Sequence, residues 1–219
     1  MPRLLFEKTG NSVWISHLDL MRLFQRAFKR AELPLKHTQG FNPRPSVSIA
    51  LPLSVGVQSG CELLDFELDG QEISNEDICS RLNEKLIEGV SVLKVYDDGR
   101  KIRDLAYLAC RVDLEYDRGV PKNALEEING LFETEEITVQ KKGKNGYVEQ
   151  DIRPMIQELS VSAVDEHRIR LDAVICCQNP SLNPSLLVSA VEKYLPMCKP
   201  DHVSFMRVEI YDNNMEVFR

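Results

Sequence analysis

The sequence predicts an α+β protein of two tandem ferredoxin-like domains, each with the element order βαββαβ, the second carrying an extra hairpin. Three observations lead to this prediction. Strand and helix patterns follow this order twice along the 219 residues. The chain is longer than the roughly 100–150 residues of a common single domain. Gly99 and a charge cluster interrupt the strand pattern, so we expect domains at residues 1–99 and 104–219.

The first half opens with a strand or tight hairpin at residues 3–15, where Gly10 gives the turn signal. Ser16 followed by Asp19 is an N-capping pattern before an amphipathic helix, which Pro34 ends. The remaining expected elements are strands at 46–55, 61–70 and 90–98 and a helix at 75–87.

The second half repeats this order. Pro121 and Pro184 lie in the first turns of its two expected helices, at 121–132 and 183–195. Strand patterns occupy residues 105–116, 135–142, 151–161, 168–177 and 202–211. Because this is one strand more than the split βαββαβ unit needs, we expect an added strand or hairpin around residues 137–160.

Composition argues against a membrane protein, a secreted protein and a cysteine-based metal site. No run of about 18 apolar residues is present and the start lacks the apolar core of a signal peptide, so we expect a cytoplasmic protein with no membrane contact. The six cysteines include no C-x-x-C pair. Their expected role is that of small buried hydrophobic residues, and we expect neither a metal nor a cofactor.

The net charge of −7 is unevenly distributed. Residues 1–46 hold eight Lys/Arg and three Asp/Glu, a balance of +5, so the remaining residues sum to −12. This distribution favours a local anion site over a generally basic nucleic-acid coat. A helical wheel of the first helix places four cations within about a third of its circumference. They are Arg22, Arg26, Lys29 and Arg30.

These cations form either a solvated helix face or an anion-binding surface. The second interpretation is favoured because the helix leads directly into HTQGFNPRPS, residues 37–46. Gly40 tolerates unusual backbone angles, while Pro43 and Pro45 restrict the backbone around Arg44 before any ligand binds. The arginine fork suits phosphate. Phe41 is either a base-stacking ring or a plug of the core below the loop.

The polar neighbours in this segment are of types that contact base edges and sugar hydroxyls. They are His37, Gln39 and Asn42. We therefore predict an anion-binding surface for an RNA backbone. Its predicted residues are Arg22, Arg26, Lys29, Arg30, Lys36, His37, Gln39, Phe41, Asn42 and Arg44.

Catalysis is a separate question. His17 lies at a helix N-terminus, where the helix dipole favours the neutral imidazole, so it is a candidate general base for a ribose hydroxyl. His37 or a nearby arginine would then assist at the phosphate. The alternative is structural, because a histidine beside a capping serine is commonly so. Walker, G-x-G-x-x-G, H-E-x-x-H and G-x-S-x-G motifs are absent from the sequence.

Residues 16–60 resemble the bacterial radical-SAM-linked protein family, a domain of unknown function. The resemblance rests on an S-H-L-D-L-x-R helix start, a Q-G-F-N-P-x-P segment and an L-P-L-x-x-G-V strand. The matching positions are Ser16, His17, Leu18, Asp19, Arg22, Gln39, Gly40, Phe41, Asn42, Pro43, Pro45, Pro52 and Gly56. DIRPMI at 151–156 is similar to the family's second half, whereas Asn183 stands where an arginine before proline is expected.

The resemblance implies a partner, namely a radical-SAM enzyme with a cobalamin-type domain. The chain itself lacks the three-cysteine cluster motif of such enzymes. With the basic first helix, this favours an RNA-binding accessory protein that presents tRNA or ribosomal RNA to that partner.

Two alternatives stay open. The expected fold is similar to that of the CRISPR repeat-processing endoribonucleases, so a metal-independent endoribonuclease using His17 is one of them. However, residues 194–205 lack the glycine-rich loop those enzymes carry before their last strand. The other alternative is a protein-docking module, whose cationic face contacts an acidic surface of the radical-SAM partner.

Overall fold

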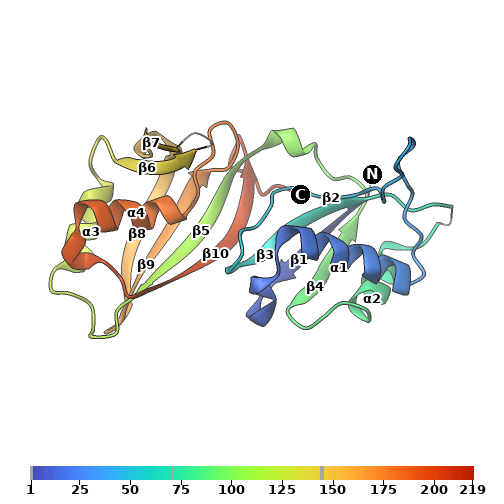
Figure 1. Ribbon diagram of the computed structural model, residues 1–219, viewed down its shortest axis with the longest axis horizontal. Helices are drawn as coiled ribbons and strands as arrows, with labels where there is room; N and C mark the ends of the chain where they lie inside the picture. The colour runs from blue at the N-terminus through green and yellow to red at the C-terminus, as the bar shows by residue number, and fades with distance from the viewer. Residues whose placement is uncertain (1, 71, 144–145) are drawn as a thin grey trace. The chain divides into compact units, whose positions relative to one another are not determined.

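The computed structural model describes residues 2–70, 72–143 and 146–219, and the chain forms two compact units (Figure 1). Unit 1 comprises Met1–Asp104 with Phe218–Arg219, and unit 2 comprises Leu105–Val217. Both units are α+β with the expected ferredoxin-like order of elements, which confirms the predicted fold class.

Unit 1 has antiparallel strands in the spatial order β4-β1-β3-β2. This is the arrangement expected of a split βαββαβ unit. Its elements are β1 (Arg3–Lys8), a 3₁₀ helix (Gly10–Trp14), α1 (His17–Arg30), β2 (Val47–Ile49), β3 (Val57–Phe66), α2 (Asn75–Asn83), β4 (Val90–Tyr96) and a second 3₁₀ helix (Ile102–Asp104).

Helices α1 and α2 share one core with these strands, and α1 lies in front of them in Figure 1. The apolar stripe of α1 supplies Phe24 and Phe28, whose rings meet Phe6 of β1 at 4.8 Å and Phe66 of β3 at 5.0 Å. This packing fixes α1 on the sheet and turns its polar side to solvent.

The start of α1 follows the predicted capping pattern. The Ser16 side chain accepts a hydrogen bond from the Asp19 N–H (3.2 Å), and its hydroxyl donates to the Asp19 carboxylate (2.8 Å). That second bond, together with Arg22 beside it, holds the pKa of Asp19 below its usual value. Asp19 is thus ionised at neutral pH and stays on the same face as the cations.

Two expected elements of unit 1 differ in the structure. The segment after β1 turns into a 3₁₀ helix and no partner strand follows it within the described residues. The strand expected at 46–55 is confined to Val47–Ile49. Beyond it lies Pro52, which has no N–H to offer a strand ladder.

Gly89 closes the turn between α2 and β4 at φ +82°. Its carbonyl oxygen accepts hydrogen bonds from the Thr9 N–H and the Ser12 hydroxyl, both at 2.7 Å. A Cβ atom at this position would lie 2.4 Å from the Thr9 carbonyl oxygen. Both the backbone angle and the close approach therefore require glycine here.

Arg3 and Asp65 form a buried ion pair between neighbouring strands β1 and β3. The guanidinium donates to the carboxylate through Nε (2.6 Å) and Nη2 (3.1 Å), and the two side chains are only 4% and 18% exposed. The Phe218 ring lies 5.6 Å from the Arg3 guanidinium carbon. Removing one member of such a pair leaves the other charge buried and uncompensated.

Unit 2 has antiparallel strands in the order β10-β5-β9-β8, with α3 and α4 on one side of them (Figure 1). The predicted extra hairpin is present as the pair β6–β7. The elements are β5 (Leu105–Glu115), α3 (Ala124–Phe132), β6 (Thr138–Gly143), β7 (Gly146–Asp151), β8 (Ile156–Asp165), β9 (Arg168–Cys176), α4 (Ser185–Tyr194) and β10 (His202–Asp212), with short 3₁₀ helices at Arg153–Met155 and Pro196–Cys198.

Two polar contacts in unit 2 differ in exposure. The buried Tyr116 hydroxyl donates to the Cys198 carbonyl oxygen at 2.9 Å, and burial raises the pKa of Tyr116 to about 12. By contrast, the ion pair of Arg111 with Asp172 (3.0 Å) has side chains 37% and 42% exposed.

In the part of the chain that the structure describes, no helix is long and apolar enough to cross a membrane, and no group of three or more His, Cys, Asp or Glu residues could hold a metal ion.

Candidate functional site

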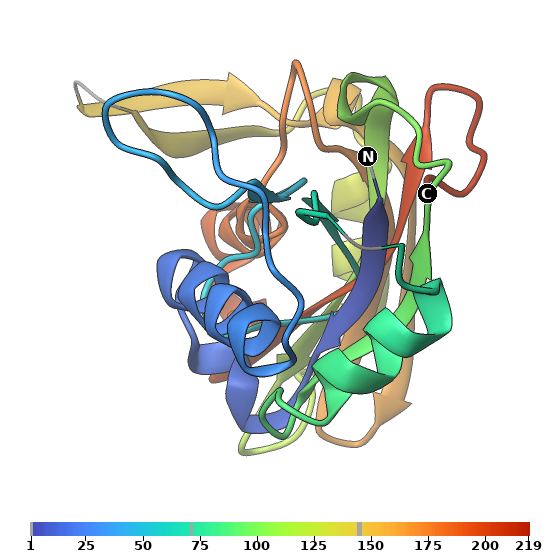
Figure 2. The same cartoon turned by 90° about the vertical axis from the view of Figure 1, so that its right-hand side faces the viewer.

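Residues 36–46 fold into a narrow loop, hereafter the 36–46 loop, that stands away from the sheet of unit 1 (light blue in Figure 2). At its base the Ser46 N–H donates to the Lys36 carbonyl oxygen (2.7 Å). One step further, the Thr38 N–H donates to the Arg44 carbonyl oxygen (2.8 Å), and the Arg44 N–H donates to Thr38 Oγ1 (3.0 Å). The backbone of Arg44 is therefore tied to the opposite arm of the loop.

The tip of the 36–46 loop carries Phe41. Its side chain is fully exposed and contacts no other aromatic ring among the described residues. The interpretation of Phe41 as a core plug is therefore wrong. Gly40 before it has φ +138°, which an L-residue rarely adopts, and this angle permits the turn that points the ring outward. Gln39 and Asn42 are exposed on either side.

Arg44 combines a fixed backbone with a free side chain. The guanidinium is exposed and has no hydrogen-bond or ion-pair partner within residues 2–70, 72–143 and 146–219. A preorganised backbone reduces the ordering entropy lost on binding, and an unpaired guanidinium can chelate a phosphate. This arrangement is suited to an anion.

The four cations of α1 are not equivalent. Arg22 pairs with Asp19 at 2.9 Å, and Arg30 turns toward the segment after α2, where Nη2 approaches the Lys85 carbonyl oxygen at 3.4 Å. Arg26 and Lys29 are exposed and unpaired among the described side chains. Of the cations in the predicted set, Arg26, Lys29 and Arg44 thus have neither a hydrogen bond nor an ion pair from their side chains in the described part of the chain.

A hollow of about 550 Å³ joins the end of α1 to the base of the 36–46 loop, and we call it the α1–loop hollow. Its lining residues are Gln25, Lys29, Glu32, Leu33, Pro34, Leu35, His37 and Pro45. Half of these residues are apolar, and the others include Lys29, His37 and the acidic Glu32. The fold therefore brings together a cation of α1 and the histidine of the loop at one hollow.

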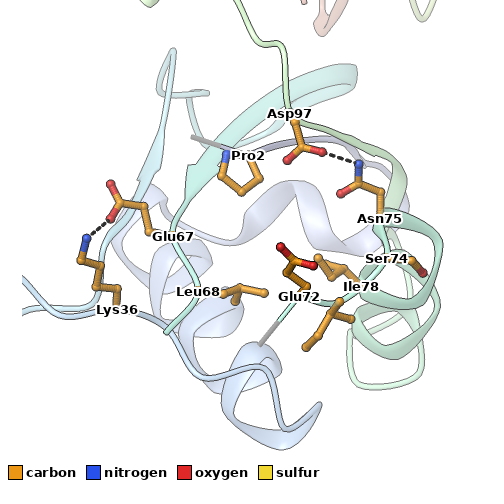
Figure 3. A pocket seen from close by; sticks show the side chains of 10 residues that line it. Pro2, Lys36, Glu67, Leu68, Glu72, Ser74, Asn75, Ile78 and Asp97 are labelled. Carbon is orange, nitrogen blue, oxygen red and sulfur yellow. Dashed lines mark hydrogen bonds and ion pairs between the residues drawn. The ribbon is translucent and has the colours of Figure 1, made fainter. Parts of the chain in front are cut away.

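Lys36 faces a different hollow. It forms an ion pair with Glu67 at 3.0 Å on the rim of a second hollow of about 550 Å³ (Figure 3). Asp97, which accepts a hydrogen bond from Asn75 at 2.8 Å, and Glu72 make this second hollow acidic. Because its charge is compensated there, Lys36 contributes less to the anion surface than the sequence indicates.

The two histidines proposed for catalysis are far apart. His17 is the first residue of α1, whereas His37 lies beside Lys29 near the other end of that helix. The rise of an α-helix separates His17 from Lys29 by about 18 Å along the axis. His17 Nδ1 is buried with no hydrogen-bond partner among the described atoms. The structure does not bring His17 and His37 into one site.

Sequence analysis did not identify Trp14, the single tryptophan of the chain. It lies at the end of the 3₁₀ helix and is 71% exposed. A Cβ at Gly56 would lie 3.3 Å from its ring, so the ring rests on that turn, next to the exposed Val55. Leu18 in the first turn of α1 is also exposed. Aromatic residues in an expected strand are ordinarily buried on one face, so no local signal indicated this exposure.

Comparison with known proteins gives a family and a fold. Residues 2–184 match the family model described as "Uncharacterized protein conserved in bacteria (DUF2344)". This confirms the bacterial domain of unknown function that the sequence motifs indicated. No curated protein matches the sequence.

Among solved structures, a chain in the crystal structure of a Cbf5–Nop10–Gar1 complex is similar, with a TM-score of 0.52 and 10% identity, over 95% of this chain and 48% of that one. The present chain thus spans about half the length of that neighbour. An unknown protein from Galdieria sulphuraria matches over 94% of this chain and 97% of its own, with a TM-score of 0.26 and 13% identity. At 10% identity the likeness to the first structure concerns the fold alone, and we draw nothing from the second.

Proposed function

The chain belongs to the bacterial DUF2344 family, and from its site we propose that it is an RNA-binding accessory protein. It works with a radical-SAM enzyme of the cobalamin type in the modification of RNA or ribosomes. One observation carries the RNA part of the proposal. Two unpaired cations of α1, Arg26 and Lys29, accompany unpaired Arg44 of a preorganised loop that has an exposed aromatic ring at its tip.

Single-stranded RNA fits this arrangement better than duplex RNA. Phe41 at the tip of the 36–46 loop can stack only on a base that has left its helix, and such stacking tolerates any base. The Arg44 fork would hold the adjoining phosphate, while Lys29 and Arg26 continue the charge along α1. The α1–loop hollow would receive a second base, next to His37.

The partnership with a radical-SAM enzyme rests on the sequence resemblance. A surface for a protein partner is supported by Trp14, which is exposed together with Val55 and Leu18. Exposed tryptophan with apolar neighbours is typical of the centre of protein interfaces. We propose that this end of unit 1 contacts the enzyme and leaves the 36–46 loop free to hold RNA.

The RNA proposal is tested by fluorescence anisotropy with fluorescein-labelled tRNA and single-stranded ribosomal RNA fragments across a salt series. Three neutralised phosphates predict that log affinity falls with log salt at a slope of about −2, from about 0.7 per phosphate. The triple variant Arg26→Ala/Lys29→Ala/Arg44→Ala should bind more weakly and with a flatter slope.

A matched control removes three exposed cations elsewhere in unit 1, in the variant Lys94→Ala/Lys101→Ala/Arg103→Ala. Both triple variants change the net charge equally, so a site-specific effect must separate them. An equal loss of RNA affinity in the two variants would mean that net charge alone causes the weaker binding. An absence of binding by the native protein at low salt would refute RNA binding.

The docking proposal is tested by co-purification with the radical-SAM enzyme after nuclease treatment. Trp14→Ala should weaken this association.

A further inference from the structure

The β6–β7 hairpin leaves unit 2 as a two-stranded arm, hereafter the β6–β7 arm (yellow in Figure 2). Its root is fixed to α4, because Lys193 Nζ and the Tyr194 hydroxyl both donate to the Thr138 carbonyl oxygen, at 2.7 and 3.0 Å. Val139 is still buried. Beyond it, residues 140–143 and 146–149 are exposed on both faces of the ribbon. Four residues of strand project about 14 Å.

The register of the β6–β7 arm places an aromatic ring beside a cation. Lys142 lies opposite Tyr147 in the ladder, and Lys141 lies opposite Val148. Because directly opposed residues share a face, Tyr147 and Lys142 stand side by side on one face of the arm. Tyr147 is 71% exposed and has no ring or hydrogen-bond partner in the described part of the chain.

The β6–β7 arm carries two unpaired lysines within a unit that is otherwise acidic. Residues 105–217 hold 12 Lys/Arg and 19 Asp/Glu, a balance of −7. The nearby carboxylates are engaged at the root, where Asp151 accepts the Ile137 N–H (2.9 Å) and Glu136 accepts the Thr138 hydroxyl (2.7 Å). Further out, Glu149 shares the Tyr147 face, but neither Lys141 nor Lys142 forms an ion pair among the described residues.

We propose that the β6–β7 arm is a second RNA-binding element, which holds a single-stranded segment by stacking a base on Tyr147. Lys142 and Lys141 neutralise the flanking phosphates. The choice of RNA follows from charge complementarity, because an acidic unit repels a polyanion. One unpaired lysine beside the exposed ring and a second on the other face of the ribbon compensate for this where the strand would pass. Lysine is, moreover, depleted at protein–protein interfaces. The inference rests on the proposed RNA-binding function and adds an element of unit 2 to it.

The test uses a 5′-fluorescein-labelled single-stranded RNA of 20 nucleotides and a labelled RNA duplex of the same length, at two or more salt concentrations. Tyr147→Ala should weaken binding of the single strand about 5-fold or more, whereas Tyr147→Phe keeps the ring and should bind within about twofold of the native protein. Lys141→Gln/Lys142→Gln should flatten the salt slope by about 1.4. Its charge-matched control is Arg118→Gln/Lys122→Gln, at two exposed positions of the same unit.

The outcomes separate this inference from the proposed function. If the Arg26/Lys29/Arg44 triple variant loses affinity while the Tyr147 and lysine variants do not, the arm is not an RNA element, although the proposed function stands. If the native protein binds neither probe, both fail. Equal weakening by Tyr147→Ala and Tyr147→Phe would overturn stacking. Loss of the radical-SAM partner in co-purification, with RNA affinity unchanged, would make the arm a protein contact and overturn the inference.

Discussion

Thr38 tests whether the 36–46 loop acts through preorganisation. In Thr38→Val the side chain keeps its shape and loses only Oγ1, the acceptor of the Arg44 N–H at 3.0 Å. The backbone bond from the Thr38 N–H to the Arg44 carbonyl oxygen remains. Because both residues are exposed, water can replace the lost partner, so the free energy lost is at the low end for a hydrogen bond, about 0.5–1 kcal/mol.

This free energy corresponds to a factor of about 2–5 in the equilibrium constant between the closed and the open loop. The Arg44 amide should therefore exchange its hydrogen with solvent about 2–5 times faster in the variant. If the closed loop is the form that binds, affinity for single-stranded RNA should fall in proportion to the closed fraction, and so by less than this factor where the closed form predominates. The thermal midpoint should stay nearly unchanged, since no core side chain is altered.

Amide exchange measured by NMR and RNA anisotropy would be recorded on the same samples, with Thr38→Ser as the control that retains Oγ. An unchanged RNA affinity in a variant whose exchange rate shows a largely open loop would refute the preorganisation argument. Unchanged exchange would show that the Thr38 side chain does not hold the loop.

Three further predictions concern stability, each measured by urea unfolding. Arg3→Met should lower the free energy of unfolding by about 3–5 kcal/mol because it leaves the Asp65 carboxylate buried without a counter-charge. Arg111→Met, at the half-exposed pair, should lower it by less than about 1 kcal/mol. Equal losses in the two variants would contradict the role of burial. Gly89→Ala should lower it by about 2 kcal/mol or more through its positive φ and the clash with the Thr9 carbonyl, and a smaller loss would mean that the turn can move. The pKa of Tyr116 is raised to about 12 in the folded state, so deprotonation of its hydroxyl favours unfolding. The free energy of unfolding should therefore fall as the pH rises above 10.0, and Tyr116→Phe should reduce that fall. An unaltered pH profile in this variant would mean that other groups cause the fall.

Local patterns were sufficient for much of the fold. The apolar stripe and the Ser16–Asp19 cap predicted α1, because helix periodicity and capping involve neighbours a few residues apart. The twofold βαββαβ order followed in the same way, as did the added hairpin near residues 137–160. The cut-off of β2 after Val47–Ile49 was not predicted, because strand length depends on a partner elsewhere in the chain.

The candidate site, too, was determined partly by local sequence and partly by the tertiary structure. The residues themselves determined that cations gather on α1 and in the 36–46 loop, and that prolines and Gly40 restrict the loop. Only the tertiary structure decided which cations are free, because Lys36 meets Glu67 and Arg30 meets the Lys85 carbonyl across long stretches of chain. It also decided that Phe41 is exposed and that His17 and His37 are separated by the length of a helix. Charge and conformational preference are properties of a residue and its neighbours in sequence, whereas pairing and burial depend on what the fold brings beside it.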